Sequence, residues 1–247
     1  MADVATEILS RELKVKYTSF AHFASSTPDH FQRLAASGLR AMFFGLETAS
    51  PEILKQATGK PQGPGVVRET IAAAQAAGIA VVCSMIVPLP GDTQETLQES
   101  LQAVIAMHPD SVPVQFPGLL PDTPWFLEPE KYGFEVDPEE YLRENMDYKI
   151  KLLFPPSFWK PLPYRLNGMD FSEFVKITGW FSQQLEAAGI LTGVPDDNIL
   201  MAELAGMPLK MLRDAARLWC ASGNAPAMGQ FVQAFNRGME KIPGQEC

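Results

Sequence analysis

The sequence predicts an α/β fold: an incomplete parallel (βα) barrel of about four strands, followed by a mainly helical C-terminal extension. Nearly all-apolar segments alternate with amphipathic segments that end at glycine, which is typical of parallel strands covered by helices. One such unit repeats: "RLAASGLRAMFFGL" (33–46) and "AQAAGIAVVCSMIV" (74–87) share the order helix, glycine, apolar strand. Their glycines, Gly38 and Gly78, lie one helix–strand unit apart.

The predicted elements alternate along the first half of the chain. Strands are expected at 14–23, 39–46, 79–87 and 111–116. Helices are expected at about 28–37, 66–77 and 92–108. Thr27 suits the N-cap of the first helix, Pro28 its first turn and Gly38 a left-handed cap at its end. For the third helix, Asp92 with Glu95 three residues later predicts a capping box.

Beyond Leu127 the sequence changes character. Residues 128–168 are acidic and then rich in proline and aromatic residues, which predicts a connector. Residues 169–247 have a helical pattern, so the predicted domains are a partial barrel over 1–127, the connector and a helical extension. The first helix of the extension carries an apolar stripe of Phe171, Phe174, Val175, Ile177, Trp180, Phe181 and Leu185. Further helices are expected at about 197–204, 208–222 and 226–240.

Composition excludes several classes of function. The net charge of −9 argues against sequence-independent binding of nucleic acid, which needs a basic face. No apolar run reaches the roughly 18 residues of a membrane span. The N-terminus carries acids and no apolar core of a signal peptide. The three cysteines, Cys83, Cys220 and Cys247, are far apart, which favours a reducing cytoplasm. Cys83 lies in an apolar strand and is expected to be a core residue.

Ligands of parallel α/β folds bind where the strands end, so the residues that leave each strand are the candidates. His22 leaves the first strand and Glu47 the second, with Lys60 later in the same loop. Glu47 has two interpretations, because an acid there would also suit the start of the helix in "TASPEIL". The aromatic residues of the connector are interpreted either as packing or as a cover over a substrate: Phe154, Phe158, Trp159 and Tyr164.

Two stretches, "LAASGLRAMFFGLETASPEILKQATGK" and "ETIAAAQAAGIAVVCSMIVPLPGDTQETLQESL", resemble the second half of the catalytic domain of radical S-adenosylmethionine (radical SAM) enzymes. They are most similar to members that often carry a cobalamin-binding domain upstream. The residues Gly45-Leu46-Glu47-Thr48 match a family strand exit, and Lys60 matches a basic residue about thirteen positions later. The segment 89–93 matches a G-x-P-G-(E/D)-T turn, with Pro88 where glycine is commoner. The resemblance covers about residues 14–127.

The resemblance implies roles for six residues. Glu47 would accept hydrogen bonds from the ribose hydroxyls of SAM, and Lys60 would pair with its methionine carboxylate. Ser84 would be a further ribose contact, and His22 would lie near the methionine part. The backbone from Val87 to Leu89 would flank the adenine. The implied parent activity is SAM cleavage, or cobalamin-dependent radical methyl transfer or rearrangement, on an unknown small-molecule substrate.

One family feature is missing from this sequence. The C-x-x-x-C-x-x-C motif, whose thiolates hold a [4Fe–4S] cluster, is absent. We therefore expect a fragment of a longer protein or the product of a gene that has lost its catalytic front half. Either way, this chain alone is expected to bind none of SAM, cluster or cobalamin tightly, and to be inactive.

A non-catalytic α/β module derived from the same fold is the alternative. A partial barrel has an open sheet edge, and proteins usually protect such edges. The expected partner is then the missing N-terminal half or a second copy of this chain. An ordinary (βα)₈ enzyme with a phosphate-binding loop is disfavoured, because the sequence has neither GxGxxG nor GxxxxGK.

Overall fold

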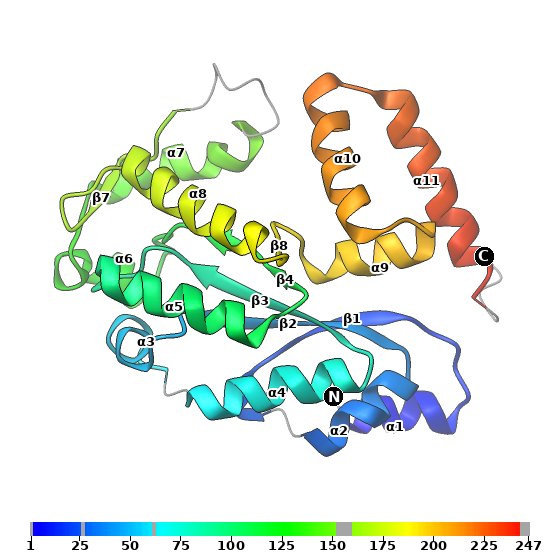
Figure 1. Ribbon diagram of the computed structural model, residues 1–247. Helices are drawn as coiled ribbons and strands as arrows, with labels where there is room; N and C mark the ends of the chain where they lie inside the picture. The colour runs from blue at the N-terminus through cyan, green and yellow to red at the C-terminus, as the bar shows by residue number, and fades with distance from the viewer. Residues whose placement is uncertain (1, 26–27, 61–62, 152–159, 243–247) are drawn as a thin grey trace.

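The computed structural model describes residues 2–25, 28–60, 63–151 and 160–242. Its central sheet is parallel, in the order β1-β2-β3-β4-β8, with β5 also paired to β3 (Figure 1). The strands are β1 (Tyr17–Ala21), β2 (Leu39–Glu47), β3 (Ala80–Ile86), β4 (Ser111–Val112), β5 (Val114–Gln115) and β8 (Leu191–Thr192). The predicted α/β class is therefore confirmed, and four of the strand positions match the expected ranges.

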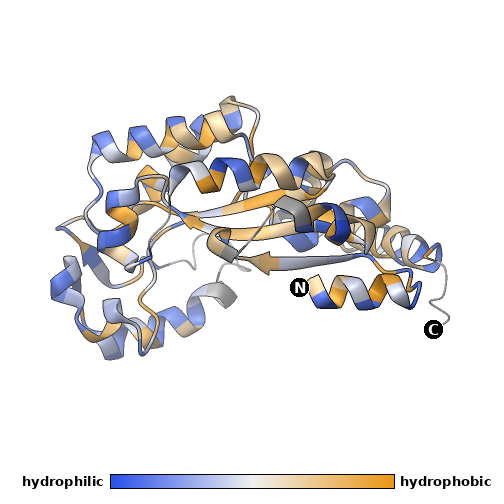
Figure 2. Cartoon of the chain, turned by 90° about the horizontal axis from the view of Figure 1, so that it is seen from below, coloured by the Kyte–Doolittle hydropathy of each residue, from blue (hydrophilic) through white to orange (hydrophobic). Residues whose placement is uncertain are grey.

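Helices cover the sheet on both sides. The N-terminal ones are α1 (Ala2–Ser10), α2 (Pro28–Ala36), α3 (Pro51–Thr58), α4 (Pro64–Ala76) and α5 (Gln94–Met107). Helices α1, α2 and α4 lie along one side of the sheet, and α9 lies along the other, with α10 and α11 beyond it (Figure 1). Figure 2 shows hydrophobic residues along the central strands and mixed faces on the helices, as expected for amphipathic elements. Among the described residues, no helix is long and apolar enough to span a membrane.

The main core lies between β2, β3 and their covering helices. Met42, Phe44 and Leu46 of β2 point to one face and are at most 1% exposed. Cys83, on the neighbouring strand, is a buried core residue as predicted, and burial raises the pKa of its thiol. The side chain of Cys220 and residue Cys247 lie outside the described part of the chain.

The second half of the chain adds elements to the sheet and builds a second core. Besides β8, the elements of this half are α6 (Pro124–Leu127), the 3₁₀ helix η2 (Pro129–Tyr132), β6 (Phe134–Val136), α7 (Pro138–Lys151), β7 (Tyr164–Leu166), α8 (Phe171–Ala187), α9 (Asp196–Ala205), α10 (Leu209–Ser222) and α11 (Ala225–Glu240). The last three agree with the helices expected from the sequence. Strands β6 and β7 form a separate antiparallel pair. Strand β8 was not expected, because two residues are too few to show a strand pattern.

Two local expectations were wrong. Val175 was placed in the apolar stripe of α8, but it is 49% exposed because the buried face of this helix runs through Phe171, Phe174, Phe181 and Leu185. The capping box of α5 is formed by Thr93 and Thr96 rather than by Asp92 and Glu95. Asp92 instead accepts hydrogen bonds from Leu89 N (2.7 Å) and Thr96 Oγ1 (2.9 Å), so its carboxylate holds the turn before the helix.

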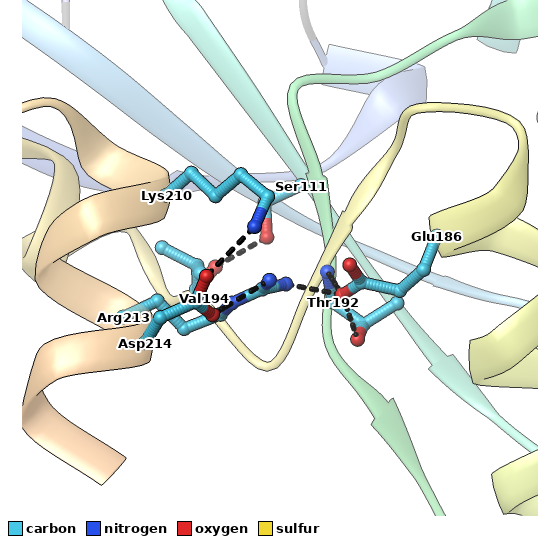
Figure 3. Close-up of polar contacts among 7 residues, drawn as sticks. All are labelled: Ser111, Glu186, Thr192, Val194, Lys210, Arg213 and Asp214. Atoms are coloured by element: carbon cyan, nitrogen blue, oxygen red, sulfur yellow. Dashed lines mark hydrogen bonds and ion pairs between the residues drawn. The ribbon is translucent and has the colours of Figure 1, made fainter. Parts of the chain in front are cut away.

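A polar cluster joins α8, β8 and α10 (Figure 3). Glu186 accepts hydrogen bonds from Thr192 N (2.9 Å) and Thr192 Oγ1 (2.7 Å) and forms an ion pair with Arg213. The side chain of Arg213 is only 7% exposed and also pairs with Asp214 at 2.9 Å. Partial burial opposes ionisation of Glu186, but the hydrogen bonds from Thr192 and Arg213 outweigh it and lower its pKa. This cluster therefore fastens the C-terminal helices to the sheet.

Replacing Arg213 by glutamine is expected to lower the free energy of unfolding by about 1–3 kcal/mol near neutral pH, because Glu186 keeps a half-buried charge without its cation. Since folding lowers the pKa of Glu186, its stabilisation is present above the ordinary value of 4.5 and is lost as the pH falls through the folded value. Denaturant unfolding at neutral and acidic pH measures both effects. The difference between native and Arg213→Gln proteins should shrink in acid.

Lys210→Gln is the control for this experiment, because Lys210 pairs with Asp214 on the exposed side of the same cluster. It should leave the denaturation midpoint unchanged. Equal losses from the two variants, or a gap that does not narrow in acid, would contradict the role given to Glu186.

Candidate functional site

An ion pair marks the point where β2 ends. Lys60 Nζ lies 3.2 Å from Glu47 Oε1, with the Glu47 side chain 15% exposed and that of Lys60 44% exposed. Helix α3 separates the two residues and ends at Gly59, whose left-handed conformation (φ 71°) turns the chain back toward the strand. The thirteen-residue spacing noted in the sequence thus corresponds to one short helix and its return.

Gly45 and Ser84 lie beside Glu47 on the paired strands. The register of β2 and β3 aligns Gly45 with Ser84, and a bulge follows between Gly45 and Glu47. A Cβ atom at position 45 would lie 2.7 Å from Glu47 Oε1, so only glycine leaves this carboxylate where it is. Glu47 itself has a positive φ of 62°, an uncommon conformation for a residue with a side chain. The structure therefore brings Glu47, Lys60 and Ser84 together.

Glu47 does not cap the helix that follows it. The N-cap of α3 is Ser50, whose hydroxyl accepts a hydrogen bond from Ile53 N. The connecting residue Thr48 is buried, and its hydroxyl lies 3.0 Å from that of Ser100 on α5. The N-cap role is thus excluded for Glu47, and its carboxylate pairs with Lys60 instead. Sequence reasoning missed the Thr48–Ser100 pair; a serine inside the apolar stripe of α5 was its only signal.

Val87 and Leu89 lie at the end of β3, and the side chain of each is 1% exposed. Val87 N donates to Gln115 O (2.7 Å), and Val87 O accepts from Thr178 Oγ1 (2.8 Å). Leu89 N donates to the Asp92 carboxylate. These backbone groups thus already have partners, and the side chains of Val87 and Leu89 pack in the core. The bond between Val87 and Pro88 is cis.

His22 follows β1, and its side chain is exposed. Its Nδ1 accepts a hydrogen bond from Ala24 N (3.2 Å) within the turn that follows the strand. Ala21 pairs with Phe44, so the turn lies at the same carboxyl edge of the sheet as Glu47. Its position is the one expected from the sequence, and its role stays a prediction.

Aromatic residues next to this edge act as packing. Trp125 Nε1 donates to Ala57 O (2.7 Å), which fixes α6 against α3, a contact that sequence reasoning missed. Tyr164 is buried in the second core, where it donates to Pro117 O and burial raises its pKa. Tyr164 therefore fits the packing interpretation rather than a substrate cover. Phe154, Phe158 and Trp159 lie outside the described residues.

The fold and this edge define the class of protein: an α/β chain with charged groups at the carboxyl ends of parallel strands. Residues 2–104 match the model of the Radical SAM superfamily, so this part of the chain is similar to that superfamily. A search of curated proteins finds no match.

The solved structures that resemble the chain include two of the radical S-adenosylmethionine methyltransferase TsrM from Kitasatospora setae. The structure with cobalamin and a [4Fe–4S] cluster bound has a TM-score of 0.59 and 14% identity, and the match covers 92% of this chain and 50% of that one. The structure with tryptophan substrate and a SAM analogue bound has a TM-score of 0.54 and 17% identity over 76% of this chain and 40% of that one. The likeness supports the fold, and the chain spans about half the length of these proteins.

The described residues do not fit a [4Fe–4S] cluster. In that part of the chain no group of three or more His, Cys, Asp or Glu side chains is placed to hold a metal ion. Cys83 is fully buried, and its raised pKa disfavours the thiolate that binds iron. Cluster ligation needs several thiolates close together, and the described residues do not provide them.

Anaerobic reconstitution of this chain with iron and sulfide should leave no bound cluster after desalting, because the cysteines are dispersed. Iron analysis and visible absorbance measure the outcome. A Cys83→Ser variant serves as control and should give the same baseline as the native chain. Retention of about four irons per chain by the native protein, in the proportion of a [4Fe–4S] cluster, would refute the expectation.

Proposed function

We propose that this chain is the second half of a radical SAM catalytic domain and supplies part of its SAM-binding site. The observation that carries the proposal is the Glu47–Lys60 pair at the carboxyl edge of the sheet, inside the segment matched by the superfamily model. The parent activity would be SAM cleavage, or cobalamin-dependent radical methyl transfer or rearrangement, on a small molecule in a reducing cytoplasm. This chain alone would be inactive.

The two charged residues would exchange their partners when SAM binds. A carboxylate accepts hydrogen bonds from two vicinal hydroxyls, so Glu47 would hold the ribose. Lys60 would turn from Glu47 to the methionine carboxylate. An ion pair with one side chain 44% exposed is worth only about 0–1 kcal/mol, so its rearrangement costs little compared with what the ligand contacts return.

The remaining candidates would complete one side of the site. Ser84, aligned with Gly45, would add a hydroxyl near the ribose. The backbone from Val87 to Leu89 would flank the adenine, and His22 would lie toward the methionine part. The cluster, and cobalamin if the parent uses it, would depend on residues outside this chain. SAM chemistry itself would come from the cofactors.

Because half a site binds weakly, nuclear magnetic resonance is the suitable assay for SAM. Titration of SAM into the ¹⁵N-labelled chain should shift the amide signals of Gly45, Glu47, Lys60 and Ser84. Glu47→Gln should weaken the binding about tenfold or more, because it removes a charged acceptor worth about 1.5–3 kcal/mol. Glu52→Gln, on the exposed first turn of α3, is the matched control and should bind like the native chain.

Shifts spread over the surface without a cluster at this edge would contradict the proposal, as would equal effects of the two glutamine variants. Circular dichroism confirms that each variant is folded. The same titration with methionine alone tests Lys60 separately, since methionine offers its carboxylate without a ribose.

A second candidate is a non-catalytic module that associates through its open sheet edge. Phe20 on β1 is 72% exposed and lies 5.0 Å, between ring centroids, from Phe43 on β2. Among the described residues β1 pairs only with β2, so no strand covers the other edge of β1. An exposed aromatic residue beside such an edge favours pairing with the missing half of the barrel or with a second copy of this chain.

If copies associate at this edge, Phe20→Asp should shift the chain toward the monomer, because a charge would be buried in the contact. Sedimentation velocity over a range of concentrations measures the change. Val175→Asp, an equally drastic replacement of an exposed residue on α8, should leave the oligomeric state unchanged. A native chain that stays monomeric at all concentrations would rule out self-association.

A further inference from the structure

A large cavity lies at the opposite end of the sheet, where the strands begin. Its volume is about 780 Å³, and α1, α2, α9, α11 and the starts of β1 and β2 surround it. Glu47 is at the far end of β2, so about 25–30 Å of strand separates the cavity from the proposed SAM site. The cavity is therefore independent of that site and of the function proposed for it.

The lining of the cavity is strongly positive. Its charged residues are Lys14, Lys16, Arg40, Arg237 and Lys241, against Glu12 and Glu203. Five cations against two acids leave a local charge of +3, in a chain whose net charge is −9. Positive charges gathered in one cavity create a local electrostatic potential that attracts anions.

The acids do not neutralise these cations. A single oxygen, Glu203 Oε1, serves both Lys16 Nζ (2.7 Å) and Arg40 Nε (3.4 Å). Arg40 Nε is buried and has no hydrogen bond to any described residue. The contact with Glu203 is thus an ion pair without a hydrogen bond; a buried donor that makes no hydrogen bond costs about 1–3 kcal/mol, so a further acceptor beside Arg40 would stabilise the protein.

The remaining cations are available at the rim of the cavity. Lys14, Arg237 and Lys241 form no ion pair within the described ranges. They come from two distant segments, one entering β1 and the other ending α11. Lys16 and Arg40 thus share one acid, Glu203. The three unpaired cations line the same cavity, Lys14 from the segment before β1 and the other two from the end of α11.

Close backbone contacts hold the two sides in place. A Cβ at Gly238 would lie 1.8 Å from Leu204 O, so α11 crosses α9 with its backbone in contact. A Cβ at Gly38, whose φ is +107°, would lie 2.0 Å from Val15 O. These glycines fix α11 and the segment before β1 relative to the start of β2. The backbone segments that carry the positive groups are therefore held in place before a ligand binds, which lowers the entropic cost of binding.

We propose that this cavity binds a small organic anion that carries at least two phosphate groups. Its volume is that of a small-molecule site. Arginine forks and lysine ammonium groups are the usual partners of phosphate oxygens, and Leu204 and Ile242 (each 7% exposed) provide an apolar contact for the organic part. The acidic surface elsewhere disfavours a long polyanion such as nucleic acid.

Inorganic tripolyphosphate is the probe that tests this proposal on the full chain. Isothermal titration calorimetry should show saturable binding to one site. Arg237→Gln and Lys241→Gln should each weaken it roughly tenfold, because each removes a charged hydrogen-bond donor. Lys176→Gln, the same charge change on the exposed face of α8, should bind like the native chain. Amide shifts on titration should cluster at residues 14–16 and 38–40.

Three results would overturn the proposal. The first is no saturable binding. The second is an equal loss in Lys176→Gln, which would indicate non-specific attraction. The third is tighter binding of a hexaglutamate peptide than of tripolyphosphate, which would indicate an acidic segment of a protein as the occupant. Arg237 and Lys241 are exposed, so their variants should fold, and circular dichroism checks this.

Discussion

The pairing of β2 with β3 is the constraint on which the rest of the structure depends. Both strands are buried on the face that meets the helices, so their side chains must stay in one register to keep Met42, Phe44 and Leu46 inside. The same register sets Gly45 beside Ser84, and the bulge that follows turns Glu47 out of the strand pattern. The packing of the core and the position of the candidate carboxylate are thus consequences of one alignment.

Much of this arrangement is predictable from the sequence because its causes are local. Gly38 and Gly78 both have a positive φ, as the helix–glycine–strand repeat predicts, and Lys60 returns to Glu47 because a short helix fills the interval. The unpredicted parts depend on distant partners. Thr48 meets a serine 52 residues away and Thr178 reaches a carbonyl 91 residues away, and no spacing rule reports such contacts. Strand β8 likewise exists only through its pairing with β4.

The two ends of the sheet differ in charge. At the carboxyl edge Glu47 and Lys60 form an ion pair, whereas the cavity at the amino edge is lined by five cations and two acids. In (βα) barrels the residues at the amino-terminal face usually stabilise the fold, whereas like charges gathered there repel one another and destabilise it. The contacts of Gly38 and Gly238 keep the backbone segments that carry these cations close together, which is why we propose an occupant for the cavity. The proposed SAM site gives no reason for these charges, so the two ends need separate explanations.

In the proposed SAM site, the Glu47–Lys60 pair would hold the carboxylate in place when no ligand is bound. A carboxylate that is 15% exposed, at the end of a strand and in a left-handed conformation, would be costly if it had no partner. Lys60 supplies the partner, and because its own side chain is 44% exposed it remains free to move away. A fully buried pair would be too costly to open, and an isolated acid would destabilise the strand exit. The intermediate burial is what a residue needs if it must be stable alone and exchange its partner for a ligand.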